Sequence, residues 1–269
     1  MTQVTPTGLD AHKPAEITQL IRLSGIAKAE MPLAPLITLS VLGGVFISLG
    51  ALFYTQTTSG FADLNGGITL MGGVAFSLGL ILVVVGGAEL FTGNTMIVMA
   101  YVDKRITSQA LLRNWAIVLL GNAMGCAAIV SLVYGAGLLD GALGQRAAAI
   151  SNAKIALAPF EAFCRGILCN ALVCLAVWLA VSARTAMGMI LSIVWPVAAF
   201  VAIGLEHSIA NLYLIPAGAL AGAPVSSGAL VANLLPVLAG NVIGGAGGVA
   251  LAYRLAYGRS LRDEPATSL

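Results

Sequence analysis

Six long runs of apolar residues, separated by short polar stretches, account for most of the chain. A helix that crosses a bilayer needs about 20 mostly apolar residues. The regions of this kind span approximately residues 31–55, 67–87, 110–138, 159–183, 188–205 and 230–257, and the second and fifth continue past an interruption. The pattern predicts an all-α membrane protein with six transmembrane helices over residues 31–257, an N-terminal tail over 1–30 and a C-terminal tail over 258–269.

The second and fifth apolar regions are interrupted by polar residues at membrane depth. After Gly87 the chain reads AELFTGN, and after Gly204 it reads LEHSIAN, before apolar sequence resumes in each case. Polar residues at this depth are costly, and proteins tolerate them where they line a cavity or pair with one another. Two broken helices at matching positions of two halves indicate a transport site.

The two halves of the chain also match each other around these interruptions. The stretch GAELFTGNTMIV aligns with GLEHSIANLYLI, and each half continues with a Gly-Asn pair. The aligned pairs are Gly87 with Gly204, Glu89 with Glu206, Asn94 with Asn211, and Asn122 with Asn241. Because each half holds three helices, an odd number, the second half must enter the membrane upside down. The sequence therefore predicts an inverted 3+3 repeat with helices 2 and 5 broken.

Composition supports a membrane protein and excludes several other classes. Hydrophobic residues make up 59% of the chain and charged residues 9%, whereas a soluble domain carries roughly a quarter charged residues. No cluster of Lys and Arg suggests a nucleic-acid surface. The four cysteines lie in apolar runs and predict neither a disulfide framework nor a metal site. There is no Walker loop, and Ser208 beside His207 is not a catalytic triad, so we expect no enzymatic activity and no cofactor.

Basic residues concentrate on one side of the predicted membrane. Ten of the thirteen Lys and Arg residues fall in the two tails, in the connections after the second and fourth regions, or at the adjoining helix ends. On the opposite side, the loops 57–66 and 222–228 carry none, and the remaining loop holds Arg146 and Lys154. Since cytoplasmic loops are enriched in Lys and Arg, both termini are predicted to be cytoplasmic.

The polar residues of the two breaks are the first candidates for function. His207 is the one histidine in the apolar regions, and its side chain titrates near neutral pH. We favour a role as proton shuttle or hydrogen-bond donor over a structural role. Acids facing an anion would repel it. Glu89 and Glu206 are therefore predicted to be structural and to accept backbone N–H bonds at the broken helix ends, with Asn94 and Asn211 beside them.

Other residues near the breaks allow more than one interpretation. Thr92 offers a hydroxyl group in the first break, while amides can line a path or only join helices. Four apolar side chains on or beside the broken helices can form constrictions, although from spacing alone ordinary packing is the simpler interpretation: Phe76, Leu80, Phe91 and Phe200. Lys154 and Arg165 can attract anions to a pore mouth. A solvated lysine and a snorkelling arginine are equally consistent with the sequence.

At these residues the sequence resembles the formate/nitrite transporter family over residues 29–257. The most specific pieces are FSLGL at 76–80, AELFTGN at 88–94, RGILCN at 165–170, EHSIAN at 206–211 and GNVIGG at 240–245. The resemblance implies an aquaporin-like protomer and a homopentamer with one pore in each protomer, in the inner membrane of a bacterium. It implies a small monovalent anion as substrate, with formate first and nitrite or hydrosulfide as alternatives, and protons and membrane lipid as further partners.

The resemblance also implies roles for individual residues. Phe76, Leu80, Phe91 and Phe200 match positions that form two apolar constrictions around the pore histidine. The residues that match the substrate pathway are His207, Thr92, Asn170, Lys154 and, less closely, Asn241. Arg165 departs from the formate channels of the family, which have an apolar residue there, and nitrite channels tend to have a lysine. The role of Arg165 and the choice among the anions therefore stay open.

The mechanism hypothesis concerns the cost of moving an ion through an apolar slit. Lys154 attracts the anion, which then accepts a proton in the region of His207 and Thr92 and crosses as the neutral acid. A transporter that couples the anion to protons can share these residues. A water or glycerol facilitator is disfavoured because the breaks read TGN and SIAN, without the expected Asn-Pro-Ala pairs.

Overall fold

The computed structural model describes residues 11–61 and 64–258, and this part of the chain forms helices and no β-strand. It contains six helical segments long and apolar enough to cross a membrane, which confirms the six predicted regions. Five of them are single helices: α2 (Leu33–Thr58), α3 (Gly66–Gly86), α6 (Ser108–Gly135), α8 (Pro159–Ser182) and α9 (Ala186–Ile203). The sixth is continuous through α11 (Ser227–Val242), the π-helical η2 (Ile243–Leu251) and α12 (Ala252–Tyr257).

Both predicted helix breaks are present, and a glycine begins each. Gly87 ends α3 and Gly204 ends α9, with φ of 82° and 78°, a left-handed conformation that costs glycine little. After each glycine, three further non-helical residues precede the point where the chain resumes as a second helix. These continuations are α4 (Phe91–Asn94), η1 (Thr95–Ile97) and α5 (Val98–Val102) after the first break, and α10 (Ser208–Leu220) after the second.

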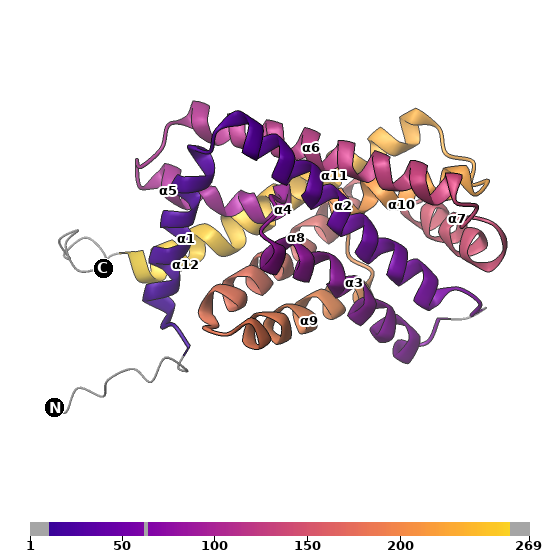
Figure 1. Ribbon diagram of the computed structural model, residues 1–269, viewed down its shortest axis with the longest axis horizontal. Helices are drawn as coiled ribbons and strands as arrows, with labels where there is room; N and C mark the ends of the chain where they lie inside the picture. Colours follow the sequence, from indigo (N-terminus) through magenta and orange to yellow (C-terminus); the bar gives the residue numbers. More distant parts are fainter. Residues whose placement is uncertain (1–10, 62–63, 259–269) are drawn as a thin grey trace.

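Two further helices lie where the sequence predicted a tail and a loop. The predicted N-terminal tail contains α1 (Pro14–Ala29), and the loop with Arg146 and Lys154 contains α7 (Gly141–Ile155). In Figure 1, α1 and α12 lie at one end of the molecule and α7 at the other. We call these the α1 end and the α7 end. Of the predicted C-terminal tail, all residues after 258 lie outside the described part of the chain.

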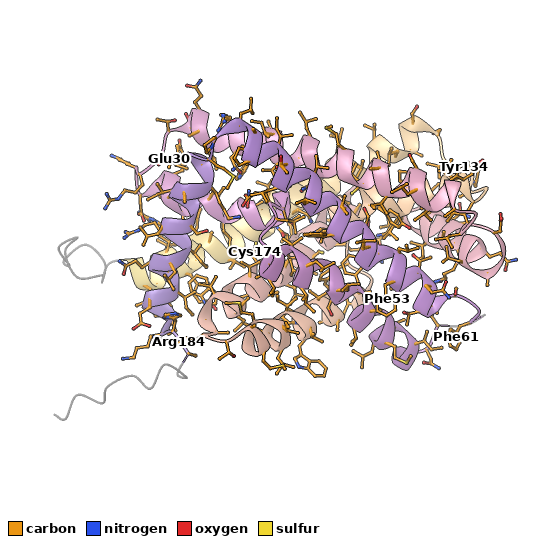
Figure 2. The ribbon with its side chains drawn as sticks, in the orientation of Figure 1. Glu30, Phe53, Phe61, Tyr134, Cys174 and Arg184 are labelled. Carbon is orange, nitrogen blue, oxygen red and sulfur yellow. The ribbon has the colours of Figure 1, made fainter. Side chains whose placement is uncertain are left out.

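The two halves repeat one packing plan. In the first half α2 packs on α3 and α6, and in the second α8 packs on α9 and α11, while α3 and α9 join the halves. Glycine permits the close approaches: a Cβ at Gly44 would overlap the backbone of Asn122, and one at Gly240 would overlap that of Phe163. Large apolar side chains such as Phe53 and Tyr134 are exposed on the outside of the bundle (Figure 2), as expected for surfaces that face lipid or another subunit.

Candidate functional site

The two helix breaks meet at a hydrogen bond between Thr92 and His207. Thr92 lies in the first turn of α4, and His207 directly precedes α10. Thr92 Oγ1 and His207 Nε2 are 2.9 Å apart, and both side chains are buried. The inverted repeat thus brings one polar side chain from each half to a single buried place.

The second contact of His207 determines where its ring carries a proton. His207 Nδ1 accepts the backbone N–H of Ala210 at 3.0 Å and so caps the first turn of α10. Because a backbone N–H can only donate, Nδ1 is unprotonated, and the neutral ring carries its proton on Nε2. His207 therefore donates to Thr92 Oγ1, and the hydroxyl proton of Thr92 remains available for another acceptor.

A lysine, a glutamate and two asparagines form a buried cluster toward the α1 end. Lys28 Nζ contacts Glu89 Oε1 at 2.6 Å and Asn94 Oδ1 at 3.1 Å. Asn94 Nδ2 donates to Glu89 Oε2 at 2.6 Å and to Asn114 Oδ1 at 2.9 Å, and Asn114 donates to the backbone carbonyl of Lys28. The last residues of α1 are thereby fixed to the first helix break.

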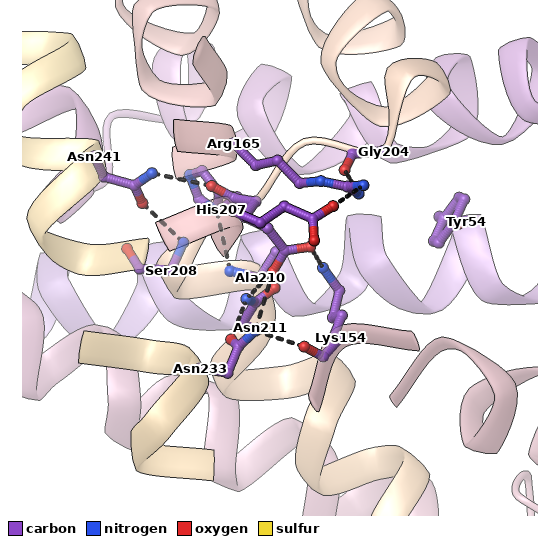
Figure 3. A network of polar contacts seen from close by, with 12 residues as sticks. Tyr54, Lys154, Arg165, Gly204, His207, Ser208, Ala210, Asn211, Asn233 and Asn241 are labelled. Carbon is purple, nitrogen blue, oxygen red and sulfur yellow. Dashed lines mark hydrogen bonds and ion pairs between the residues drawn. The ribbon is translucent and has the colours of Figure 1, made fainter. Parts of the chain in front are cut away.

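The second half contains the same cluster toward the α7 end. Lys154 Nζ contacts Glu206 Oε1 at 2.8 Å, Asn211 donates to Glu206 Oε2 at 2.6 Å and to Asn233 Oδ1, and Asn233 donates to the backbone carbonyl of Lys154 (Figure 3). The lysine side chain is 13% exposed. Lys154 was predicted to be a loop residue at a pore mouth. It lies instead in the last turn of α7, where it is a largely buried partner of Glu206.

The carboxylates do not cap the broken helices as the sequence suggested. Among the described residues, the partners of Glu89 and Glu206 side chains are lysine and asparagine side chains. The backbone N–H groups are capped by other asparagines: Asn122 Oδ1 accepts from Phe91 N at 2.9 Å, and Asn241 Oδ1 accepts from Ser208 N at 2.9 Å. A neutral amide also donates, which a carboxylate cannot do.

The donor groups of these two asparagines join the breaks to a neighbouring helix. Asn122 Nδ2 donates to the carbonyls of Ser40 and Glu89, and Asn241 Nδ2 donates to those of Gly166 and Glu206. Each amide thus makes two bonds to the backbone of its break, which no regular helix satisfies, and one bond to a carbonyl inside a neighbouring helix. The match in the sequence between the two Gly-Asn pairs revealed their equivalence, but it did not indicate this capping function.

Two cavities approach the Thr92–His207 contact from opposite ends. The cavity toward the α7 end, of about 190 Å³, is lined by His207, Lys154, Glu206 and the aromatic rings of Phe76 and Phe200 among others. The cavity toward the α1 end, of about 340 Å³, is lined by groups that include Lys28, Glu89, Leu80 and Leu90. We call them the α7-side and α1-side cavities. No residue lines both.

An apolar partition separates the cavities. Phe76 and Leu80 lie four residues apart on α3, about 6 Å along the helix, yet Phe76 lines the α7-side cavity and Leu80 the α1-side cavity. The ring of Phe76 packs edge-on to that of Phe200, with centroids 5.6 Å apart, and Phe200 stacks on His207 at 6.0 Å. Along α3 the two cavities are therefore lined by residues about one helical turn apart.

Not every predicted constriction residue lies at a cavity. Phe91 packs edge-on against Trp115, with centroids 6.1 Å apart, and it lines neither cavity. Its neighbour Leu90 and, from α8, Val177 line the α1-side cavity together with Leu80. Sequence analysis missed Leu90 because the irregular break has no helical period that tells which of two adjacent residues faces inward. It missed Val177 because no local pattern relates this residue of α8 to the break.

The predicted pathway asparagines lie behind the cavity walls. Asn170 and Asn241 are fully buried and line neither cavity. Asn170 Nδ2 donates to the carbonyl of Thr92 at 3.2 Å and to that of Asn241 at 2.6 Å, while its Oδ1 has no hydrogen-bond partner among the described residues. Both residues therefore support the Thr92 and His207 segments from behind.

A helical membrane protein with inverted halves, paired breaks and a cavity at each end belongs to the class of membrane transport proteins. The comparisons with known proteins identify the particular group: the sequence model of the formate/nitrite transporter family matches residues 15–255. The chain belongs to that family, which is a family of transport proteins and not of enzymes.

Relatives and a solved structure agree with this family over nearly the whole chain. The uncharacterized transporter YrhG of Bacillus subtilis (strain 168) is 40% identical, covering 94% of this chain and 96% of the relative. The formate channel FocA of Escherichia coli (strain K12) is 38% identical, covering 92% and 95%. A solved structure described as a pentameric formate channel with formate bound is 35% identical, with a TM-score of 0.75 over 82% of this chain and 96% of that one.

Proposed function

We propose that this protein conducts formate across a bacterial inner membrane as a homopentamer with one pore in each protomer. The relatives named formate channels and the pentameric formate-bound structure support formate and the pentamer. Among the matched relatives, formate recurs as the named substrate, so nitrite and hydrosulfide rank behind it. The excess of basic residues in the tails and their neighbouring connections supports cytoplasmic termini. The α7 end then faces outward.

The main barrier to such a function is the apolar partition. An ionised carboxylate that leaves water without partners is destabilised by several kcal/mol or more. The neutral acid avoids most of this cost. An apolar partition with a hydrogen-bonding group beside it suits a small weak acid that is charged in both cavities and neutral during the crossing.

The observation that carries the proposal is the Thr92–His207 hydrogen bond beside this partition. With His207 Nε2–H donating to Thr92, the threonine hydroxyl can donate in turn to a carboxylate oxygen. His207 lines the α7-side cavity directly. The pair positions the anion beside the partition by hydrogen bonding, and a hydronium ion in the cavity gives it a proton and becomes water. Phe76, Phe200, Leu80 and Leu90 then exclude water and other ions.

The decisive test is formate flux into proteoliposomes from mildly acidic to mildly alkaline pH, with nitrite, hydrosulfide and chloride as competing substrates. We expect selective formate uptake that rises as the pH falls, and a fall of about tenfold or more for His207→Ala and Thr92→Val, because each removes a donor from the crossing point. Thr92→Ser keeps the hydroxyl and serves as the control. Equal passage of chloride, or undiminished formate flux in His207→Ala, would refute the proposal.

A further inference from the structure

The two cavities differ in charge although the repeat makes their lysine clusters alike. The charged residues that line the α1-side cavity are Lys28 and Glu89, which form an ion pair. Those that line the α7-side cavity are Arg146, Lys154, Arg165 and Glu206. Three cations therefore accompany one carboxylate at the α7 end. Arg146 and Arg165 have no counterpart among the residues that line the α1-side cavity.

Lys154 is already engaged and contributes little free charge. Its ammonium group is 2.8 Å from Glu206 and largely buried. A cation that is held this closely by a carboxylate presents a dipole to an incoming ion more than a net charge. The attraction of anions to this cavity must therefore depend on the two arginines.

Arg165 is held at the cavity wall by two contacts. Its Nη1 donates to the carbonyl of Gly204 at 2.9 Å, where α9 ends, and its Nη2 contacts Glu161 at 2.6 Å (Figure 3). The Arg165–Glu161 pair is exposed, with side chains 37% and 47% accessible. Solvent weakens such a pair, so Glu161 only partly offsets the guanidinium that lines the cavity.

Arg146 has no carboxylate partner among the described residues. Its Nε donates to Thr58 Oγ1 at 3.1 Å and its Nη2 approaches Tyr54 Oη at 3.4 Å, both neutral groups at the end of α2. A guanidinium has five N–H donors, so several remain for a ligand. Glu161 and Glu206 offset the charges of Arg165 and Lys154. The positive charge of Arg146 is therefore left without a compensating carboxylate at the cavity.

We propose that Arg146 and Arg165 form a carboxylate-binding site in the α7-side cavity, where formate binds before it reaches His207. A planar guanidinium suits the two oxygens of a carboxylate, and a cationic cleft with apolar walls concentrates anions. The inference rests on the proposed function and assigns to the arginines a role in affinity and specificity. It gives the pore a binding step on the α7 side that the α1 side lacks.

The test measures initial formate flux into proteoliposomes against formate concentration. Arg146→Gln and the double variant Arg146→Gln/Arg165→Gln are compared with Arg146→Lys and Arg146→Lys/Arg165→Lys. We expect the half-saturating concentration to rise about tenfold in the double glutamine variant, with a largely unchanged maximal rate. The lysine variants keep the charge but lose the planar pair of donors, so their half-saturating concentrations should lie between those of the unmodified protein and of the glutamine variants. Arg105→Gln, which removes an exposed charge outside both cavities, is the matched control.

Each outcome decides between the possibilities. A rise in the half-saturating concentration that becomes smaller at high ionic strength supports electrostatic binding of formate by the arginines. An unchanged half-saturating concentration in both glutamine variants overturns the inference while leaving formate conduction intact. A loss of maximal rate in the lysine variants as well would assign the arginines a structural role and also overturn it. Absence of formate flux in the unmodified protein would overturn the proposed function and this inference together.

Discussion

Replacing the asparagine that caps either helix break should destabilise the protein by an amount that the hydrogen bonds predict. Asn122→Leu keeps the number and branching of the side-chain heavy atoms but removes three bonds, of 2.9, 2.7 and 2.9 Å, to the backbone of Phe91, Ser40 and Glu89. The orphaned, buried N–H group of Phe91 costs about 2 kcal/mol. Each lost bond to a carbonyl costs about 0.6 kcal/mol, the average for interhelical side-chain bonds in membranes. The expected loss is therefore about 3 kcal/mol.

The inverted repeat supplies an independent replicate of this experiment. Asn241→Leu removes the corresponding bonds to Ser208, Gly166 and Glu206, so its loss should be similar. In detergent, the thermal midpoint measured by fluorescence-detected gel filtration should fall by roughly 6–12 °C for either variant. Asn152→Leu, at an exposed position of α7, should stay near the unmodified protein. Midpoints for Asn122→Leu and Asn241→Leu that match this control would show that the break backbone finds other partners, and would refute the reasoning.

Two further predictions follow from the clusters and the partition. Lys28→Ala leaves the buried carboxylate of Glu89 without its cation and should destabilise the protein by about 2–3 kcal/mol. This loss is smaller than for a fully buried pair because Lys28 is 29% exposed. A thermal midpoint equal to that of Lys28→Arg would contradict this prediction. Leu90→Ala should widen the α1-side cavity and raise chloride leakage in the flux assay. Phe91→Ala should instead lower stability by about 3 kcal/mol without leakage, and leakage in both variants would disprove the reassignment.

The sequence predicted those features that depend on hydropathy and on repetition. Six spans follow from segment length, and both breaks follow from polar residues at membrane depth. The alignment of Glu89 with Glu206 correctly indicated equivalent positions in the two halves, and the structure places them in equivalent clusters.

The sequence could not reveal contacts between residues far apart in the chain. Lys28 lies 61 residues from its partner Glu89, and no local pattern relates the two. The helix α1 does carry local signals, with Pro14 in the first turn, Glu16 bonded to the backbone of Lys13, and a lysine in the last turn. Its polar composition sets it apart from the apolar segments by which hydropathy reveals the six spans.

The bond between His207 Nδ1 and the Ala210 N–H couples protonation of the histidine ring to the backbone conformation of α10. A proton can join Nδ1 only when that N–H has lost its acceptor, so charging the ring and loosening the first turn of α10 are one event. The ring then becomes cationic only in the fraction of molecules whose turn is open, so the free energy of that local opening is part of the free energy of charging the ring. A substitution that stiffens the turn would therefore change the free energy of charging the ring without altering the histidine.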